Sequence, residues 1–575
     1  MNKLLNDFRQ QSIWYRIITI ATFVFAFFFL YRCCNNKFDT LNAINEYREA
    51  ADVQLTQAFL MGENPYRLDS LLEYDGESMP PVVYQYSFFN NAVCSLVALI
   101  LGKNVVLAHY IVALSSMIGS AVIIFLFIKR KVNNYACPMV GAALTLFCHW
   151  RAGYLSTTPN SLGIFLMLLT AYCASSGRLK ERSRLIVTAV LSVLLFYTKL
   201  YFVTVALGIF VFYFMYRKKE AWKYFGLCIL IGALSIGLMM LIWPLYFTYN
   251  LYFVNGMGLW YIPGALRFSS SITDIAAGTF AMVANLNLDA LNHLFDQFRY
   301  MFITFAGLFA VLLYSAITGA IKKKKINVTP EDTLSLCTIL SITQGLCMLV
   351  LGKADGMYLT YFLQLWIPFV IAAAMICADK YVIADIDGIF KDNRLPGIAF
   401  LIILSLVSVY LGYKKLPLHV MTDEEKYNWQ AASDYIEKYE QSDYKESAYQ
   451  LNESKNVYYA PELAYIAINH NIRGYDNGHV EAAEPVGYGI WKTEKLSQVI
   501  FPYAGKIAEI NIDYQNKVTD RIRNREYSLV TIDDVDCLGH KELPGILEES
   551  GYKRIDTLPL SVGNATYDVE FWVAE

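Results

Sequence analysis

Apolar runs of about 15 to 25 residues recur along the chain up to about residue 412, separated by polar or charged connections. A helix needs about 20 apolar residues to cross a bilayer, so this pattern predicts a polytopic α-helical membrane protein. About eleven runs are candidate transmembrane helices: residues 14–31, 105–128, 134–149, 159–175, 185–198, 202–216, 223–243, 301–320, 333–351, 359–378 and 395–412.

A further apolar run, "SFFNNAVCSLVALILG" at residues 87–102, competes with these spans. Counting it would move the basic loop "KRK" (129–131) to the outside, against the positive-inside rule, so we expect an interfacial helix here.

Composition agrees with a membrane protein. The chain has 575 residues, 56% of them hydrophobic, and a mean hydropathy of +0.35, which is too apolar for a soluble protein of this size.

Lys and Arg gather in alternate connections, which predicts that these connections are cytoplasmic. Lys3, Arg9 and Arg16 precede or begin the first span, and no small-residue cleavage site follows it, so it is expected to remain as an anchor with a cytoplasmic N-terminus. An odd number of spans then places the C-terminal region outside. The basic connections lie at residues 129–131, 177–184, 217–219, 322–325 and 380–394.

Residues 413–575 differ from the rest, because short helix-like and strand-like segments alternate with turns. We expect two domains, a membrane domain over 1–412 and an extracytoplasmic α/β domain of Rossmann-like layering over 413–575. Acidic residues outnumber Lys and Arg in this region, which argues against a nucleic-acid partner. It has no GxGxxG or P-loop, and the eleven cysteines of the chain show no CxxC or metal-ligand spacing.

The first outside loop, residues 33–86, is strongly acidic. Within it, "NEYREAADVQLTQAFLMGENPY" (45–66) has many helix-forming residues and is ended by Gly and Pro. In a helix along the membrane surface, Glu46, Glu49 and Asp52 share one side. A carboxylate held at the bilayer edge can accept a proton from a hydroxyl. The simpler interpretation of most acids in this loop is a solvated outside surface.

The same stretch carries a resemblance to a known family. The acidic "YREAADVQLTQAFLMGENPY" followed by "MPPVVYQYSFFNNAVCSLVALILGK" resembles the first outside loop of the GT-C superfamily of membrane glycosyltransferases. "WRAGYLSTTPNSLGIFLML" (150–168), "FYTKLYFVTVALGIF" (196–210) and "GKADGMYLTYFLQLWIPF" (352–369) are similar to later loops of these enzymes. Asn160 stands where relatives often have Asp.

The resemblance implies transfer of a sugar from a polyprenyl-phosphate donor to an acceptor hydroxyl outside the cytoplasm, usually with inversion. A carboxylate would activate the acceptor, and cations would stabilise the departing lipid phosphate. Glu49 best matches the family loop, with Glu46, Asp52 and Asp39 as rivals for the base. Lys199, which interrupts the apolar-aromatic "LLFYTKLYFV", is the first choice for the phosphate, followed by Arg151.

Several assignments stay open. Lys353, Arg267 and Arg299 are further outside cations, and each cation could equally extend to the interface as an ordinary surface residue. Substrate contacts are expected from Tyr66, Tyr84, Tyr358 and Asn160, although aromatic belts at the bilayer edge explain such tyrosines equally well.

Other classes of function also remain open. A multi-span transporter or flippase fits the composition, and a non-catalytic polymer-assembly protein fits Asn160. A divalent cation on Glu46, Glu49 and Asp52 is allowed by their spacing but not required. The resemblance implies a glycan, glycolipid or protein as the acceptor and a hexose or pentose as the sugar, and the compact loops suit a bacterial plasma membrane.

Overall fold

The computed structural model describes most of the helical body and part of the C-terminal region. The described residues are 2–38, 47–74, 87–151, 155–250, 307–318, 333–351, 365–383, 399, 421–440, 452–454, 456–460, 463–469, 472–473, 502–532, 543–562 and 565–575.

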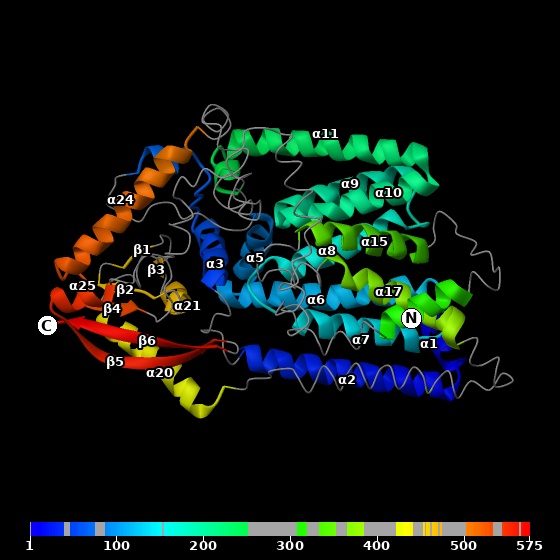
Figure 1. The fold of residues 1–575 in the computed structure, drawn as a ribbon, viewed down its shortest axis with the longest axis horizontal. Coiled ribbons are helices and arrows are strands. Elements are labelled where there is room, and N and C mark those ends of the chain that lie inside the picture. Colours follow the sequence, from blue (N-terminus) through cyan, green and yellow to red (C-terminus); the bar gives the residue numbers. More distant parts are fainter. Residues whose placement is uncertain are drawn as a thin grey trace.

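The described part of the chain before residue 384 is entirely helical. Its long helices lie side by side along the longest axis of the molecule, and neighbours in sequence are joined by short turns (Figure 1). The helices are α1 (Asn2–Arg9), α2 (Ile13–Phe38), α3 (Tyr47–Leu60), α4 (Asp69–Leu72), α5 (Phe89–Ile100), α6 (Val105–Lys129), α7 (Ala136–Arg151), α8 (Asn160–Ala174), α9 (Glu181–Thr198), η1 (Leu200–Val203), α10 (Thr204–Tyr216), α11 (Lys218–Ile242), α15 (Thr333–Leu351), α17 (Ile367–Cys377) and η4 (Ala378–Ile383), with a further helix at Gly307–Thr318.

Each predicted span except 395–412 contains a described helix. The span at 395–412 lies outside the described residues apart from residue 399. Among the described residues, three helices are long and apolar enough to cross a membrane, namely Ile13–Asn35, Val105–Lys129 and Lys218–Ile242. The helical membrane body is therefore present, and the total of eleven spans stays a prediction. The run at 87–102 forms α5, whose 12 residues make it about 18 Å long, too short to cross the hydrocarbon core.

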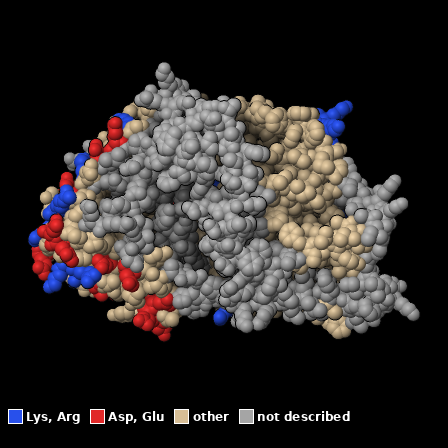
Figure 2. Space-filling view, viewed as in Figure 1, with Lys and Arg blue, Asp and Glu red and all other residues tan. Residues whose placement is uncertain are grey.

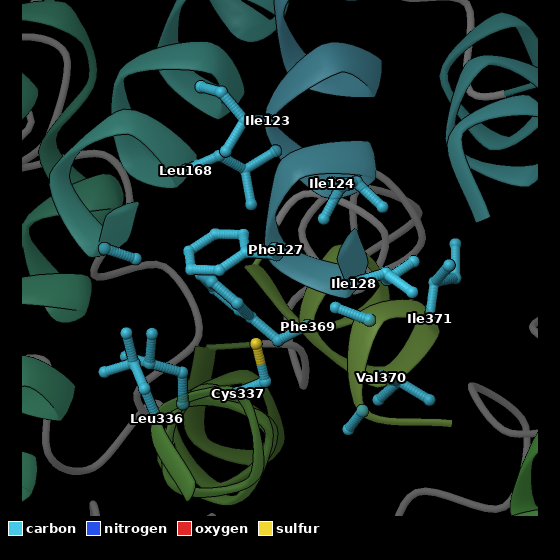
Figure 3. Packing of buried hydrophobic residues seen from close by; sticks show 14 of the residues in the cluster. Ile123, Ile124, Phe127, Ile128, Leu168, Leu336, Cys337, Phe369, Val370 and Ile371 are labelled. Carbon is cyan, nitrogen blue, oxygen red and sulfur yellow. The ribbon is translucent and has the colours of Figure 1, made fainter. Parts of the chain in front are cut away.

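The centre of the bundle is apolar and closely packed (Figure 3). Phe127 and Ile128 of α6 face Phe369 and Val370 of α17, and Cys337 of α15 completes this layer. Helix α17 is apolar all round and all of its residues are buried, as expected for a central helix. By contrast, only 6% of the span in α11 is buried, so α11 is an outer helix. Lipid is as apolar as these side chains, so close van der Waals packing holds the helices together.

Two glycines illustrate how closely the helices approach one another. A Cβ at Gly163 of α8 would overlap the ring of Phe202 in η1, and a Cβ at Gly208 of α10 would meet Leu340 and Thr343 of α15. Phe202 is fully buried, so its ring has little room to move. The absence of a side chain at 163 therefore fixes where η1 and the residues beside it lie.

Basic residues lie at the end of the bundle opposite the C-terminal strands. Because the helices alternate in direction, the α6–α7, α8–α9 and α10–α11 turns all lie at this end. Two of them are joined by Glu220, which accepts from Arg184 at 2.7 Å and from Arg217 at 3.2 Å, with all three side chains largely buried. The alternate connections that are rich in Lys and Arg in the sequence therefore lie together at one end of the bundle.

The C-terminal segment (residues 421–575) contains strands and helices and lies at the other end of the bundle (Figure 1). Figure 2 shows charged side chains gathered over this segment, whereas the described surface of the bundle on the same face is mostly uncharged. Its elements are α20 (Asp423–Tyr439), β1 (Asn452–Glu453), β2 (Val457–Tyr458), α21 (Ala464–Asn469), β3 (Ile472–Arg473), α24 (Ala504–Arg523), β4 (Leu529–Ile532), α25 (Leu543–Glu549), β5 (Tyr552–Val562) and β6 (Ala565–Ala574).

The main sheet of this segment has the order β2-β4-β6-β5. β2 and β4 are parallel, whereas β6 is antiparallel to both β4 and β5. A Rossmann-like layer has parallel strands, so the described sheet departs from that expectation at the β5–β6 hairpin.

Helix α20 covers the hairpin, and Trp429 Nε1 of this helix donates to the backbone carbonyl of Ser561 at 3.2 Å. Nearby, burial and the charge of Glu440 raise the pKa of Tyr459 well above its ordinary value, so its hydroxyl stays protonated and bonds to Glu440.

Apolar side chains join the C-terminal segment to the helical bundle. Val53 of α3 and Ala108 of α6 pack in one buried cluster with Tyr465 and Ile466 of α21. A second cluster joins Leu55 and Tyr66 to tyrosines and a tryptophan of the C-terminal segment. Helices α3 and α6 are therefore covered by α21 where they meet the C-terminal segment.

Gly163→Ala should destabilise the protein, because the added methyl group overlaps the buried ring of Phe202. Overpacking of this kind costs about 1–3 kcal/mol. We expect a lower Tm of the purified protein in detergent, measured by intrinsic fluorescence. Gly226→Ala is the matched control, since no atom lies within 4 Å of its Cβ position and Ala favours a helix. Equal Tm values for the two variants would contradict this account of the α8–η1 contact.

Candidate functional site

The acidic stretch of the first loop forms a helix, as expected, but this helix is buried. In α3, the residues from Asp52 to Ala58 all have little or no exposed surface. They lie against α5 and α6 and are covered by the C-terminal segment. This part of the loop was predicted to differ from a solvated surface, and Asp52, only 1% exposed, is a buried carboxyl group.

Of the candidate bases, the structure describes only the side chain of Asp52. Glu49 lies in the first turn of α3, and its side chain is outside the described residues, as is the whole of Glu46. Glu49 remains the predicted base from the sequence. Burying a carboxyl group is costly, and protein chains keep such groups mainly where they are paired or functional. The role of Asp52 as the base stays a prediction.

Side chains of α5 and α6 hold α3 in place. Asn91 Nδ2 donates to the backbone carbonyl of Asp52 at 2.5 Å, and Ser95 Oγ donates to that of Thr56 at 3.3 Å. Thr56 Oγ1 also lies 2.6 Å from His109 Nε2. Because the bonds from α5 go to backbone atoms, they position α3 as a whole.

Two residues that the sequence singled out separately, Lys199 and Asn160, are in contact. Lys199 Nζ donates to Asn160 Oδ1 at 2.9 Å, and the Tyr201 hydroxyl donates to the same oxygen at 3.3 Å. An ammonium group has only donors, so the amide oxygen of Asn160 must face it. Asn160 is buried, whereas Lys199 and Tyr201 are partly exposed.

The local sequence explains this meeting. Helix α9 ends at Thr198, and Lys199 adopts an extended backbone, with φ −164° and ψ 129°, before η1 begins. Asn160 is the first residue of α8, directly after Pro159, whose fixed φ suits the start of a helix. The C-terminus of one helix thus meets the N-terminus of its neighbour at the end of the bundle that carries α3 and the C-terminal segment (Figure 1).

Tyr66 is described, and it has no exposed surface. Its ring packs against Trp243 at 5.7 Å and Tyr246 at 5.2 Å between ring centroids. Its carbonyl accepts from the backbone N–H of Leu245 at 3.1 Å. In this structure Tyr66 joins the first loop to the segment after α11, and its substrate contact stays a prediction.

The remaining predicted residues are not described in enough detail to be placed. Arg151 is the last residue of α7, and its side chain is outside the described residues. Tyr84, Lys353 and Tyr358 lie outside them entirely, as do Asp39, Arg267 and Arg299.

The structure shows polar residues of this region that the sequence analysis passed over. His109 is 1% exposed near the start of α6, and its Nδ1 lies 2.7 Å from the carbonyl of Thr157 in the turn before α8. Asn90 Nδ2 donates to the same carbonyl at 3.4 Å, and Thr157 Oγ1 lies 3.0 Å from the hydroxyl of Tyr465. His109 could have been found, because an ionisable residue inside an apolar span marks a functional candidate.

The possible divalent cation on the acidic helix stays a prediction. Within the described part of the chain, no group of three His, Cys, Asp or Glu side chains is arranged to hold a metal ion. The side chains of two of the three proposed ligands, Glu46 and Glu49, lie outside the described residues.

Comparisons with known proteins identify the fold. No protein-family model matches the chain, and no curated protein matches it either. Among solved structures, the apo oligosaccharyltransferase of Archaeoglobus fulgidus aligns with a TM-score of 0.50 and 12% identity, over 90% of this chain and 69% of that chain. Oligosaccharyltransferase AglB of the same organism, in complex with an inhibitory peptide and a dolichol-phosphate, aligns with a TM-score of 0.47 and 12% identity, over 91% and 70%. Apo ArnT of Cupriavidus metallidurans aligns with a TM-score of 0.49 and 12% identity, over 96% and 97%.

The match to the apo oligosaccharyltransferase extends along nearly the whole chain, although the two sequences share few residues. At this identity the likeness concerns the fold. This chain has the GT-C fold of membrane glycosyltransferases, which confirms the resemblance inferred from its motifs.

Tyr465→Phe should loosen the contact between α21 and the turn before α8. The substitution removes one buried hydrogen bond, worth about 1 kcal/mol, and keeps the ring that fills the apolar cluster. We expect faster hydrogen–deuterium exchange at residues 155–160 and 464–469, read by mass spectrometry. Tyr427→Phe, at a ring that is 71% exposed, is the control. Exchange rates equal to those of the wild type in both segments would refute the role given to this bond.

Proposed function

We propose that this protein is an integral-membrane glycosyltransferase that moves a sugar from a polyprenyl-phosphate donor to an acceptor hydroxyl on the outer side of the membrane. The GT-C fold supports the class of enzyme. The observation that carries the assignment is the Lys199–Asn160 contact at the N-terminus of α8, at the same end of the bundle as the buried acidic helix α3.

Lys199 is suited to bind the phosphate of the donor. Its partner Asn160 is neutral, so the hydrogen bond orients the ammonium group without cancelling its charge. The first turn of α8 adds backbone N–H groups and the positive end of the helix dipole, which also favour an anion. A phosphate at this point would be held by a full charge and by oriented dipoles.

The reaction that fits this arrangement is a single displacement. A carboxylate of α3, Glu49 or Asp52, takes the proton from the acceptor hydroxyl, whose oxygen bonds to the anomeric carbon. The bond between that carbon and the phosphate oxygen breaks, and polyprenyl phosphate leaves with the electron pair and one additional negative charge. Attack from the face opposite the leaving group inverts the anomeric centre. Lys199 stabilises the charge that develops on the phosphate.

The basic end of the bundle supports the proposed orientation. Lys and Arg concentrate on the cytoplasmic side of membrane proteins, so the turns that carry Arg184 and Arg217 face the cytoplasm. The candidate site and the C-terminal segment then face outward. We place the protein in a bacterial plasma membrane, with its N-terminus inside and residues 413–575 as an outer α/β domain.

A non-catalytic member of the same fold is the second candidate, because Asn160 stands where related enzymes often have an acid. The two candidates predict opposite effects of Asn160→Asp on activity.

Removal of the base should abolish transfer. Glu49→Gln and Asp52→Asn keep the size of each side chain and remove its charge. The variant that lacks the base should lose about 10²- to 10⁴-fold in kcat, since general base catalysis contributes a factor of this size. Purified protein is incubated with a panel of polyprenyl-phosphate sugars and a cell-envelope lipid extract, and freed polyprenyl phosphate is measured by mass spectrometry.

Glu73→Gln, at an exposed acid of the same loop, is the control. Full activity of both charge-removing variants would place the base outside α3. No release by the wild type from any donor would count against the enzyme and favour a transporter or an assembly protein.

Asn160→Asp should lower activity, because the new carboxylate would pair with Lys199 and cancel the charge offered to the phosphate. Lys199→Gln should act in the same direction, and we expect a loss of about tenfold or more in kcat/KM for each. Asn524→Asp and Lys553→Gln, both on the exposed surface of the C-terminal segment, are the controls. A gain of activity in Asn160→Asp would show instead that the natural chain lacks a catalytic acid, as the non-catalytic alternative requires.

A further inference from the structure

His109 connects the two halves of the candidate site. It lies between Thr56, on the acidic helix α3, and Thr157, in the turn that leads into Asn160. Its two ring nitrogens contact one partner each, at 2.6 Å and 2.7 Å. The ring is therefore a direct bridge between the helix with the candidate bases and the turn beside the candidate phosphate site.

Chemistry fixes the tautomer of this bridge. A carbonyl oxygen only accepts, so the nitrogen facing Thr157, Nδ1, must carry a hydrogen. In the neutral ring Nε2 then accepts the hydroxyl hydrogen of Thr56. The Thr56 hydroxyl has a second acceptor within reach, the carbonyl of Asp52 at 3.2 Å, but the contact with His109 is much shorter. Both contacts are buried, so water does not compete for either hydrogen bond.

The partners of His109 are themselves held. Asn91 binds the carbonyl of Asp52, one turn before Thr56, so a shift of Thr56 would move the backbone that carries the candidate bases. On the other side, Thr157 lies three residues before Asn160, the partner of Lys199. A change in the His109 bridge therefore alters the separation between the proton-accepting and phosphate-binding groups.

We propose that His109 is a positioning residue, which fixes the acidic helix α3 relative to the Lys199–Asn160 contact and so sets the distance between the base and the departing phosphate. This inference rests on the proposed function. His109 itself touches neither substrate nor the reacting atoms in this role.

Three substitutions separate the two contacts. His109→Asn places an amide where Nδ1 lies and keeps the bond to Thr157, whereas His109→Gln reaches the place of Nε2 and keeps the bond to Thr56. His109→Leu removes both. Ser116→Ala, at another buried polar residue of α6, controls for a general loosening of the helix.

The first measurement is hydrogen–deuterium exchange, which does not depend on activity. We expect faster exchange at 47–60 in His109→Asn, at 155–160 in His109→Gln, and at both in His109→Leu. Unchanged exchange in both segments of His109→Leu would overturn the bridge, whatever reaction the protein performs.

The second measurement is steady-state kinetics, which gives kcat per folded molecule and the KM for the donor. Misplacement by about 1 Å can cost roughly 100-fold in rate, so His109→Leu should lose about 10- to 100-fold in kcat with little change in donor KM. The Asn and Gln variants should fall between it and the wild type. A residue needed only for packing would lower Tm and the folded fraction and leave kcat per folded molecule unchanged, which would overturn the positioning role.

The two hypotheses fail in different ways. If the wild type transfers no sugar from any donor, the proposed function is wrong. The hydrogen–deuterium exchange experiment still tests whether His109 joins α3 to the turn before α8.

Discussion

Polar groups withdrawn from water inside a membrane protein must be paired by the protein itself, and this constraint governs the end of the bundle next to the C-terminal segment. Unpaired polar groups cost several kcal/mol each in an apolar environment. The structure meets the cost with hydrogen bonds that cross between elements. Thr56 of α3 meets His109 of α6, and Thr157 of the turn before α8 meets Tyr465 of α21. The relative positions of these four elements are therefore linked, because a shift in one breaks bonds in the next.

The apolar centre of the bundle gives this end a rigid support. Phe127, Phe369 and Cys337 come from three different helices and leave little free space between them (Figure 3). Close packing transmits strain, and Gly163 lies against Phe202, three residues after Lys199. Functional groups placed at the ends of rigid helices are held more precisely than groups on loops. Lys199 and Asn160 occupy two such ends.

The charge balance at Lys199 distinguishes this chain from relatives with an acid at the position of Asn160. An amide and a carboxylate can both accept the hydrogen bond, but only the amide leaves the ammonium charge intact. With an acid at position 160, the same geometry would form an internal ion pair with Lys199. The GT-C fold persists at 12% identity because it depends on apolar patterning and packing, which many sequences satisfy.

Much of the fold was predictable from the sequence. The long apolar runs predicted the helices, since a span of fixed length in lipid leaves few alternatives, and the helix over the acidic stretch followed from its composition. Lys199 was identifiable as a cation that interrupts an apolar segment, and Asn160 from the family resemblance. The departure of the C-terminal sheet from parallel layering was not predictable, because strand pairing depends on contacts between distant segments.

The sequence by itself determined the membrane character of the chain and its helical body, because hydrophobic length and charge act locally along the chain. Only the tertiary structure decided that Asp52 is buried, that Asn160 is the partner of Lys199, and that His109 joins α3 to the turn before α8. Each of these facts depends on residues far apart in sequence. Burial and hydrogen bonding are properties of such neighbours in space, and no local pattern records them.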